Sequence, residues 1–131
     1  MRKITFPLLA LSLIIPLLIA CGGESNEGRG SAKAGEKLFK EVAIGNQAGC
    51  STCHSLEPDV ILVGPSLAGV AGRAGERVAD LSAEEYLNQS IVGPDAYTVE
   101  GFPASVMPLV WSSVLSEGQV NDLVAFMMTL K

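Results

Sequence analysis

Histidine and cysteine, the usual ligands of protein-bound zinc, are scarce in this chain. His54 is the only histidine, and the three cysteines are Cys21, Cys50 and Cys53. A structural zinc ion takes four such ligands, and Cys21 stands apart at the start of a polar segment, so a zinc site is not expected. Residues 45–60 also lack the strand-rich pattern of a βαβ unit, which argues against a thioredoxin-type thiol pair.

Basic residues are scarce as well. The chain has 9 Lys and Arg against 14 Asp and Glu, a formal net charge of −5. Arg2 and Lys3 precede Cys21 and every acidic residue follows it, so residues 21–131 carry 14 acids against 7 bases, a net −7. A negative surface repels nucleic acids and anionic lipid headgroups. Neither is expected as a partner.

The long uncharged run of the sequence stands at its N-terminus. Arg2 and Lys3 are followed by residues 4–20, which carry no charge. A short basic start and an apolar run are typical of an export signal. Pro7 and Pro16 interrupt the run, which suits a cleaved signal better than a permanent span, although an uncleaved membrane anchor stays an alternative.

Cys21 follows Leu18-Ile19-Ala20, and the four residues together resemble the bacterial lipobox. The resemblance implies cleavage before Cys21 and a diacylglycerol on its thiol; the alternative is a chance cysteine near a cleavage site. Residues 22–31 are glycine and polar residues, as expected of a flexible tether. We therefore expect a signal peptide over 1–20, a lipidated tether over 21–31 and a domain over 32–131, held on the membrane and facing the periplasm or the cell exterior.

Cys50-Ser51-Thr52-Cys53-His54 is a C-x-x-C-H pattern. The cysteine count alone would suggest a disulfide with one thiol left over, but this spacing is typical of covalent haem attachment. Two thiols one turn apart form thioethers with the porphyrin vinyl groups, and the adjacent imidazole then lies beneath the iron. The motif predicts one haem c, bound by Cys50 and Cys53, with His54 as an iron ligand.

Several further segments accompany that motif, and over residues 32–131 the chain resembles the class I cytochromes c. The matching positions are Gly35 and Phe39, Gly64-Pro65-Ser66-Leu67, Gly72-Arg73-Ala74-Gly75, and residues 122–126. The resemblance implies an all-α fold of about four helices around one haem. It also implies that the Pro65 carbonyl accepts a hydrogen bond from His54. Residues 41–49 depart from the family pattern as a longer insertion, which we expect to be a loop.

Helix boundaries are indicated by two capping boxes. Ser82 with Glu85 opens a helix that Gly93-Pro94 ends, and Ser116 with Gln119 opens the final helix. In the final helix the apolar residues recur at helical spacing and predict one packed face: Val120, Leu123, Val124 and Met127.

The sixth iron ligand cannot be a second histidine, because the chain has none. After Cys21 the methionines are Met107, Met127 and Met128. Met107 is the best candidate, because it lies 53 residues beyond His54 outside the final helix and Pro108 follows it. The Met-Pro pair resembles the distal ligand motif of the family, although a methionine that only fills the core stays an alternative.

Aromatic residues make up only 5% of the chain, so each is expected mainly to pack in the core. Trp111 and Tyr97 flank the distal loop and are also candidates for a hydrogen bond to a haem propionate.

These residues together favour a single-electron carrier and not an enzyme, with no small-molecule substrate. The expected partners are redox proteins, such as a respiratory or photosynthetic donor and a terminal oxidase or reductase. A haem sensor or small haem enzyme with an open distal site is one alternative, and a permanent subunit of a larger respiratory complex is another. Met107 separates the carrier from the sensor, since a filled sixth site leaves no position for a ligand.

Overall fold

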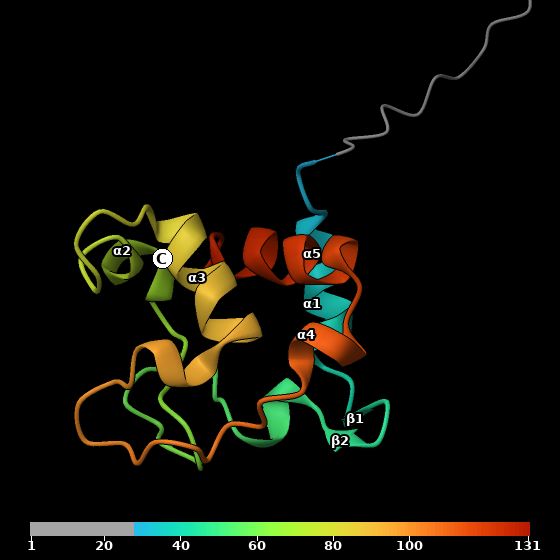
Figure 1. Cartoon of the computed structure of the whole chain (residues 1–131), viewed down its shortest axis with the longest axis horizontal. Coiled ribbons are helices and arrows are strands. Elements are labelled where there is room, and N and C mark those ends of the chain that lie inside the picture. Colours follow the sequence, from blue (N-terminus) through green and yellow to red (C-terminus); the bar gives the residue numbers. More distant parts are fainter. Residues whose placement is uncertain (1–27) are drawn as a thin grey trace, which may run out of the picture.

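The computed structural model describes residues 28–131 (Figure 1). The signal peptide expected over 1–20 and the lipidation expected at Cys21 lie outside the described residues. The described chain is mainly helical, with α1 (Ala32–Phe39), β1 (Ala43–Ile44), β2 (Gln47–Ala48), the 3₁₀ turn η1 (Cys50–Thr52), α2 (Val70–Ala74), α3 (Ala83–Val92), η2 (Pro94–Ala96), α4 (Trp111–Val114) and α5 (Glu117–Met127). The expectation of about four helices is close: α2 and α4 are single turns beside the three longer helices.

Both predicted capping boxes are confirmed. The side chain of Ser82 accepts a hydrogen bond from the backbone N–H of Glu85, and the Glu85 carboxylate accepts one from the N–H of Ser82. Ser116 and Gln119 repeat this exchange at the start of α5. Gly93 follows α3 directly, as predicted. These ends depend on residues within one helical turn, which is why the sequence locates them.

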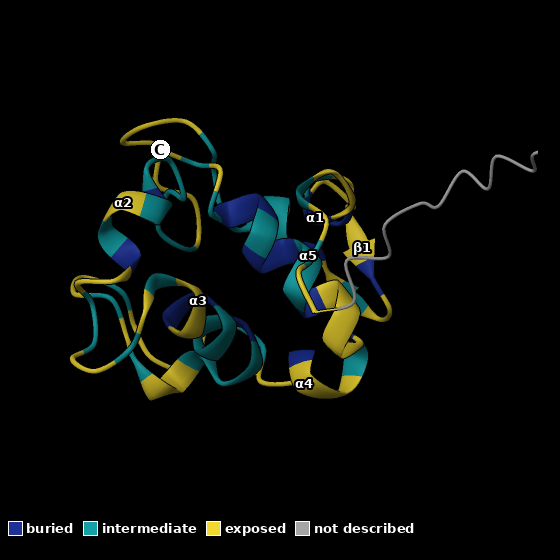
Figure 2. Cartoon of the chain, turned by 90° about the horizontal axis from the view of Figure 1, so that it is seen from above, coloured by how far each residue is buried: buried dark blue, intermediate teal, exposed yellow. Residues whose placement is uncertain are grey.

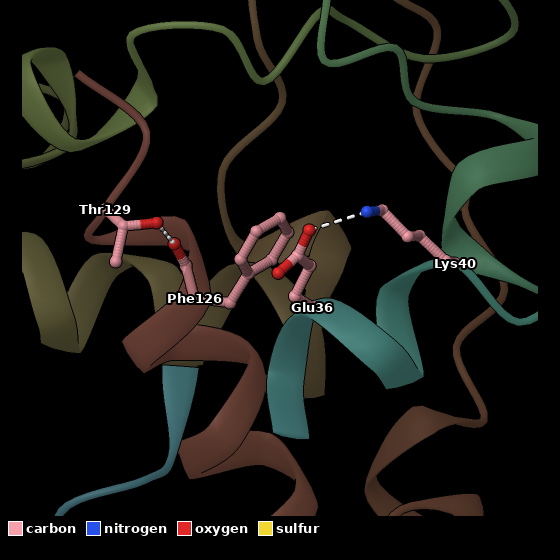
Figure 3. A network of polar contacts seen from close by, with 4 residues as sticks. All are labelled: Glu36, Lys40, Phe126 and Thr129. Carbon is pink, nitrogen blue, oxygen red and sulfur yellow. Dashed lines mark hydrogen bonds and ion pairs between the residues drawn. The ribbon is translucent and has the colours of Figure 1, made fainter. Parts of the chain in front are cut away.

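Helices α1 and α5 cross closely (Figure 1). A Cβ atom at Gly35 would lie only 1.9 Å from the carbonyl oxygen of Asp122, so this position admits no larger residue without moving a helix. The rings of Phe39 and Phe126 meet beside it with centroids 5.5 Å apart. The outer side of the crossing is polar: Figure 3 shows the exposed ion pair between Lys40 and Glu36.

The residues just before α1 contact α5. Ser31, assigned to the tether, is the N-cap of α1, and its backbone N–H donates to Oδ1 of Asp122 at 2.6 Å. A Cβ atom at Gly30 would lie 1.9 Å from the carbonyl oxygen of Asn121. Gly30 and Ser31 therefore pack against α5 as part of the domain.

The insertion expected to be a loop contains a small hairpin. β1 and β2 pair antiparallel with Ala43 opposite Ala48, and Gly45 takes a left-handed φ of +59° in the turn. The backbone N–H of Gly49 then donates to the carbonyl oxygen of Val42 at 2.8 Å. The hairpin returns the chain to its starting point, so the insertion leaves Cys50 beside the end of α1.

The buried side chains form one hydrophobic cluster contributed by all five helices and the hairpin. Figure 2 shows buried residues, in dark blue, along α3 and α5. No buried residue is polar or charged in the described part of the chain. Among residues 28–131, no helix has the length and apolar content needed to cross a bilayer.

Candidate functional site

The turn η1 carries the C-x-x-C-H motif. The backbone N–H groups of Cys53 and His54 both donate to the carbonyl oxygen of Cys50, at 3.1 and 2.9 Å. This tight turn brings two half-buried thiols and one imidazole to the same side of the chain. Burial raises the pKa of the Cys50 thiol.

The His54 imidazole is fixed by the segment that follows. Its Nδ1 lies 2.8 Å from the carbonyl oxygen of Pro65, the atom pair that the sequence resemblance implied. A carbonyl oxygen can only accept, so Nδ1 carries the hydrogen and Nε2 of the neutral ring keeps a free lone pair. Burial lowers the pKa of His54 and favours that neutral form, while the bond to Pro65 acts in the opposite direction. Such an imidazole is prepared to bind a metal through Nε2.

Two further residues support this arrangement of His54, and the sequence analysis had assigned no role to either. A Cβ atom at Gly64 would lie 2.5 Å from Cε1 of His54, so glycine there makes room for the ring. The Arg73 guanidinium donates to the carbonyl oxygens of Ser66 and Ala68, at 2.6 and 2.5 Å. Arg73 thereby holds the loop that presents the Pro65 carbonyl to His54.

A cavity of about 270 Å³ opens in front of the imidazole. It brings together every site residue that the sequence analysis named in the domain: Cys50, Cys53, His54, Pro65 and Met107. Met127 also lines the cavity, from the packed face of α5, whereas Met107 comes from the loop before α4. The thioethers of Met107 and Met127 therefore border the cavity, whereas Met128 does not line it.

The walls of the cavity are mainly aliphatic and aromatic side chains, with contributions from α1, α3 and α5. An apolar cavity with two thiols, a neutral imidazole and thioethers on its lining has the donor set of a covalently attached, axially ligated haem. Within residues 28–131, no group of three or more His, Cys, Asp or Glu side chains could hold a metal ion by itself. The residues present therefore fit a haem better than a bare metal ion.

The predicted contact between Trp111 and a haem propionate stays a prediction. Trp111 is 3% exposed and lines the cavity, but its Nε1 has no hydrogen-bond partner and is closed off from solvent. Tyr97 packs its ring edge against Tyr86, with centroids 5.6 Å apart. For both residues, a hydrogen bond to a haem propionate stays a prediction.

The family model described as Cytochrome c matches residues 32–131, which is more than half of the chain and includes every residue of the cavity named above.

Proposed function

The chain belongs to the cytochrome c family, whose members bind covalent haem c and carry electrons, and from this we propose that it passes single electrons between membrane-associated redox complexes. In this proposal its iron is ligated by His54 and Met107. The observation that carries the proposal is the meeting of both cysteines, His54 and Met107 at one apolar cavity. When bound, the haem supplies an iron that changes between the ferrous and ferric states. With both axial positions filled, no position at the iron remains for a substrate.

The residues around the iron determine its reduction potential. The hydrogen bond from His54 Nδ1 to Pro65 fixes the ring orientation and raises the basicity of Nε2. A thioether such as that of Met107 is a soft ligand that favours ferrous iron and raises the reduction potential. The mainly apolar walls lower the dielectric constant around the site, which also affects the reduction potential.

The surface near the cavity suggests what kind of partner would dock. Of the exposed large hydrophobic side chains in the described chain, all except Val42 lie in two loops, at residues 60–63 and 106–110. Val63 and Val106 line the cavity, but the remaining five do not, so a haem would leave them on the surface. Residues 60–72 and 101–116 also contain no charged side chain.

These two exposed apolar loops support partners that present an apolar face. They contrast with the acidic remainder of the chain. The proposed partners are a respiratory or photosynthetic donor and a terminal oxidase or reductase. Weak electron-transfer encounters typically bury less than about 1,200 Å² in total, which two short loops can provide. Because residues 60–72 and 101–116 carry no charged side chain, docking through these two loops should depend little on salt.

The proposal is tested by measuring electron transfer from the reduced, haem-loaded protein to membranes of the source organism. Reduced haem-loaded protein should be reoxidised by these membranes, at a rate that changes less than about threefold between roughly 20 and 500 mM NaCl. Leu109→Glu, which puts a charge on the exposed apolar loop at residues 106–110, should slow the reaction about tenfold or more. Ala34→Glu adds the same charge at an exposed position of α1 and should leave the rate unchanged. If the membranes neither oxidise nor reduce the protein, the carrier proposal is wrong.

We also propose that Cys21 is lipidated after removal of residues 1–20 and that the lipid holds the domain at the membrane, facing the periplasm or the cell exterior. The lipobox resemblance and the polar composition of residues 22–31 support this. Mass spectrometry of the mature protein should give an N-terminus at Cys21 that carries an acyl-bearing mass. Cys21→Ser should lose that mass and keep the haem spectrum, because Cys50, Cys53 and His54 stay unchanged. A mature protein that begins at another residue would contradict the assignment.

A further inference from the structure

Residues 97–110, the segment that presents Met107, contain no helix or strand. Only one backbone hydrogen bond begins and ends within them, from the N–H of Phe102 to the carbonyl oxygen of Val99. A loop with so few internal bonds has many accessible conformations, and ordering it costs entropy. Something outside the loop must therefore determine where Met107 lies.

Asp95 provides the contact that reaches this loop. The backbone N–H of Ser105 donates to its Oδ1 at 2.8 Å, and the Ser105 hydroxyl donates to its Oδ2 at 2.6 Å. In the described structure these are the only hydrogen bonds of residues 97–109 that involve a side chain. Both carboxylate oxygens of Asp95 accept hydrogen bonds from the same residue, Ser105, which lies two positions before Met107. Hydrogen bonds to an ionised carboxylate are stronger than those between neutral groups.

The backbone at Ser105 shows why such a contact is needed. Ser105 has a φ of +59°, in the left-handed region that a serine rarely occupies. A non-glycine residue remains there only when its surroundings hold it. The hydrogen bonds to Asp95 also lower the pKa of its carboxyl group, so the carboxylate form that accepts both bonds is favoured.

Asp95 itself belongs to the fixed part of the fold. It lies in η2, immediately after α3, whose Tyr86, Leu87 and Ile91 are buried in the core. Pro94 precedes it in the same turn, and Tyr97 follows with its ring against Tyr86. The carboxylate is thus anchored to α3. Its hydrogen bonds to Ser105 fix the position of the Met107 loop relative to that helix.

We propose that Asp95 is a positioning residue for the distal iron ligand: its carboxylate holds Ser105 and thereby presents the Met107 sulfur to the iron. The proposal rests on the proposed ligation by Met107. Asp95 acts only through its two hydrogen bonds to Ser105. Its effect is to reduce the fraction of time in which the sixth position is open.

The test uses the full haem-loaded protein and carbon monoxide, which binds ferrous iron only when Met107 has left it. Asp95→Ala removes both acceptors and should bind carbon monoxide about tenfold faster than the natural protein. It should also weaken the long-wavelength sulfur-to-iron absorption band of the oxidised form. Asp95→Asn and Ser105→Ala each keep one of the two hydrogen bonds and should give intermediate rates. Glu100→Gln is the matched control, because Glu100 is an exposed acid of the same loop with no side-chain hydrogen bond.

A positioning role and a purely structural role of Asp95 predict different results. If Asp95→Ala lowers thermal stability but leaves the band and the carbon monoxide rate unchanged, Asp95 is only structural and the inference is wrong. Should Asp95→Ala fail to fold, unchanged rates in both Asp95→Asn and Ser105→Ala would overturn it equally. If the natural protein has no sulfur-to-iron band, the ligation by Met107 fails first, and the proposed function has to be revised independently of Asp95.

Discussion

Replacing both cysteines, in a Cys50→Ala, Cys53→Ala protein, should abolish covalent haem attachment completely. The natural protein should keep its haem colour after denaturation and electrophoresis, and the double variant should show none. The reason is that each thiol forms one thioether with the porphyrin, and no other cysteine lies in the described chain. The variant also loses the group that fills its cavity, so it should unfold at lower temperature.

The structure supplies a close control for this result. Ser51→Ala changes a residue between the two cysteines and leaves both thiols, the imidazole and the bonds to the Cys50 carbonyl in place. It should retain the haem at natural levels. Haem that extracts freely from the natural protein into acidified acetone would show that the attachment is not covalent.

The parts of this fold that the sequence predicts well are those in which neighbouring residues determine the structure. The capping boxes at Ser82 and Ser116 each need only the residue three positions on. The C-x-x-C-H turn is local for the same reason. The hairpin of residues 43–48 was missed because strands of two residues are too short to show an alternating pattern, although the Gly45-Asn46 pair is a hairpin signal.

Other features depend on contacts between distant parts of the chain. The bonds from Ser105 to Asp95 join residues ten positions apart across an irregular loop, and neither residue belongs to a recognisable pattern. Trp111 was a candidate hydrogen-bond donor by type alone, and only the packing around its ring shows that the N–H is enclosed. The cavity also adds Met127 to its lining, although the sequence pattern assigned Met127 only to the packed face of α5.

Met107→Ala should remove the distal ligand, and the electron-carrier function depends on this result. The natural oxidised protein should show the weak long-wavelength band of His/Met-ligated haem, and the variant should lack it. The reduction potential should fall by on the order of 100 mV, because a soft donor that favours ferrous iron is lost and axial ligands spread haem potentials over about 0.8 V. Ferrous Met107→Ala protein should bind carbon monoxide rapidly.

Met127→Leu separates the two methionines that line the cavity. Met127 is 7% exposed and packs in the buried face of α5, so a volume-conserving change should cost less than about 1.5 kcal/mol of stability and leave the band and the potential nearly unchanged. A band that survives Met107→Ala and disappears in Met127→Leu would reverse the assignment. If the natural ferrous protein already binds carbon monoxide readily, its sixth position is open, and a haem sensor or enzyme explains the cavity better than a carrier does.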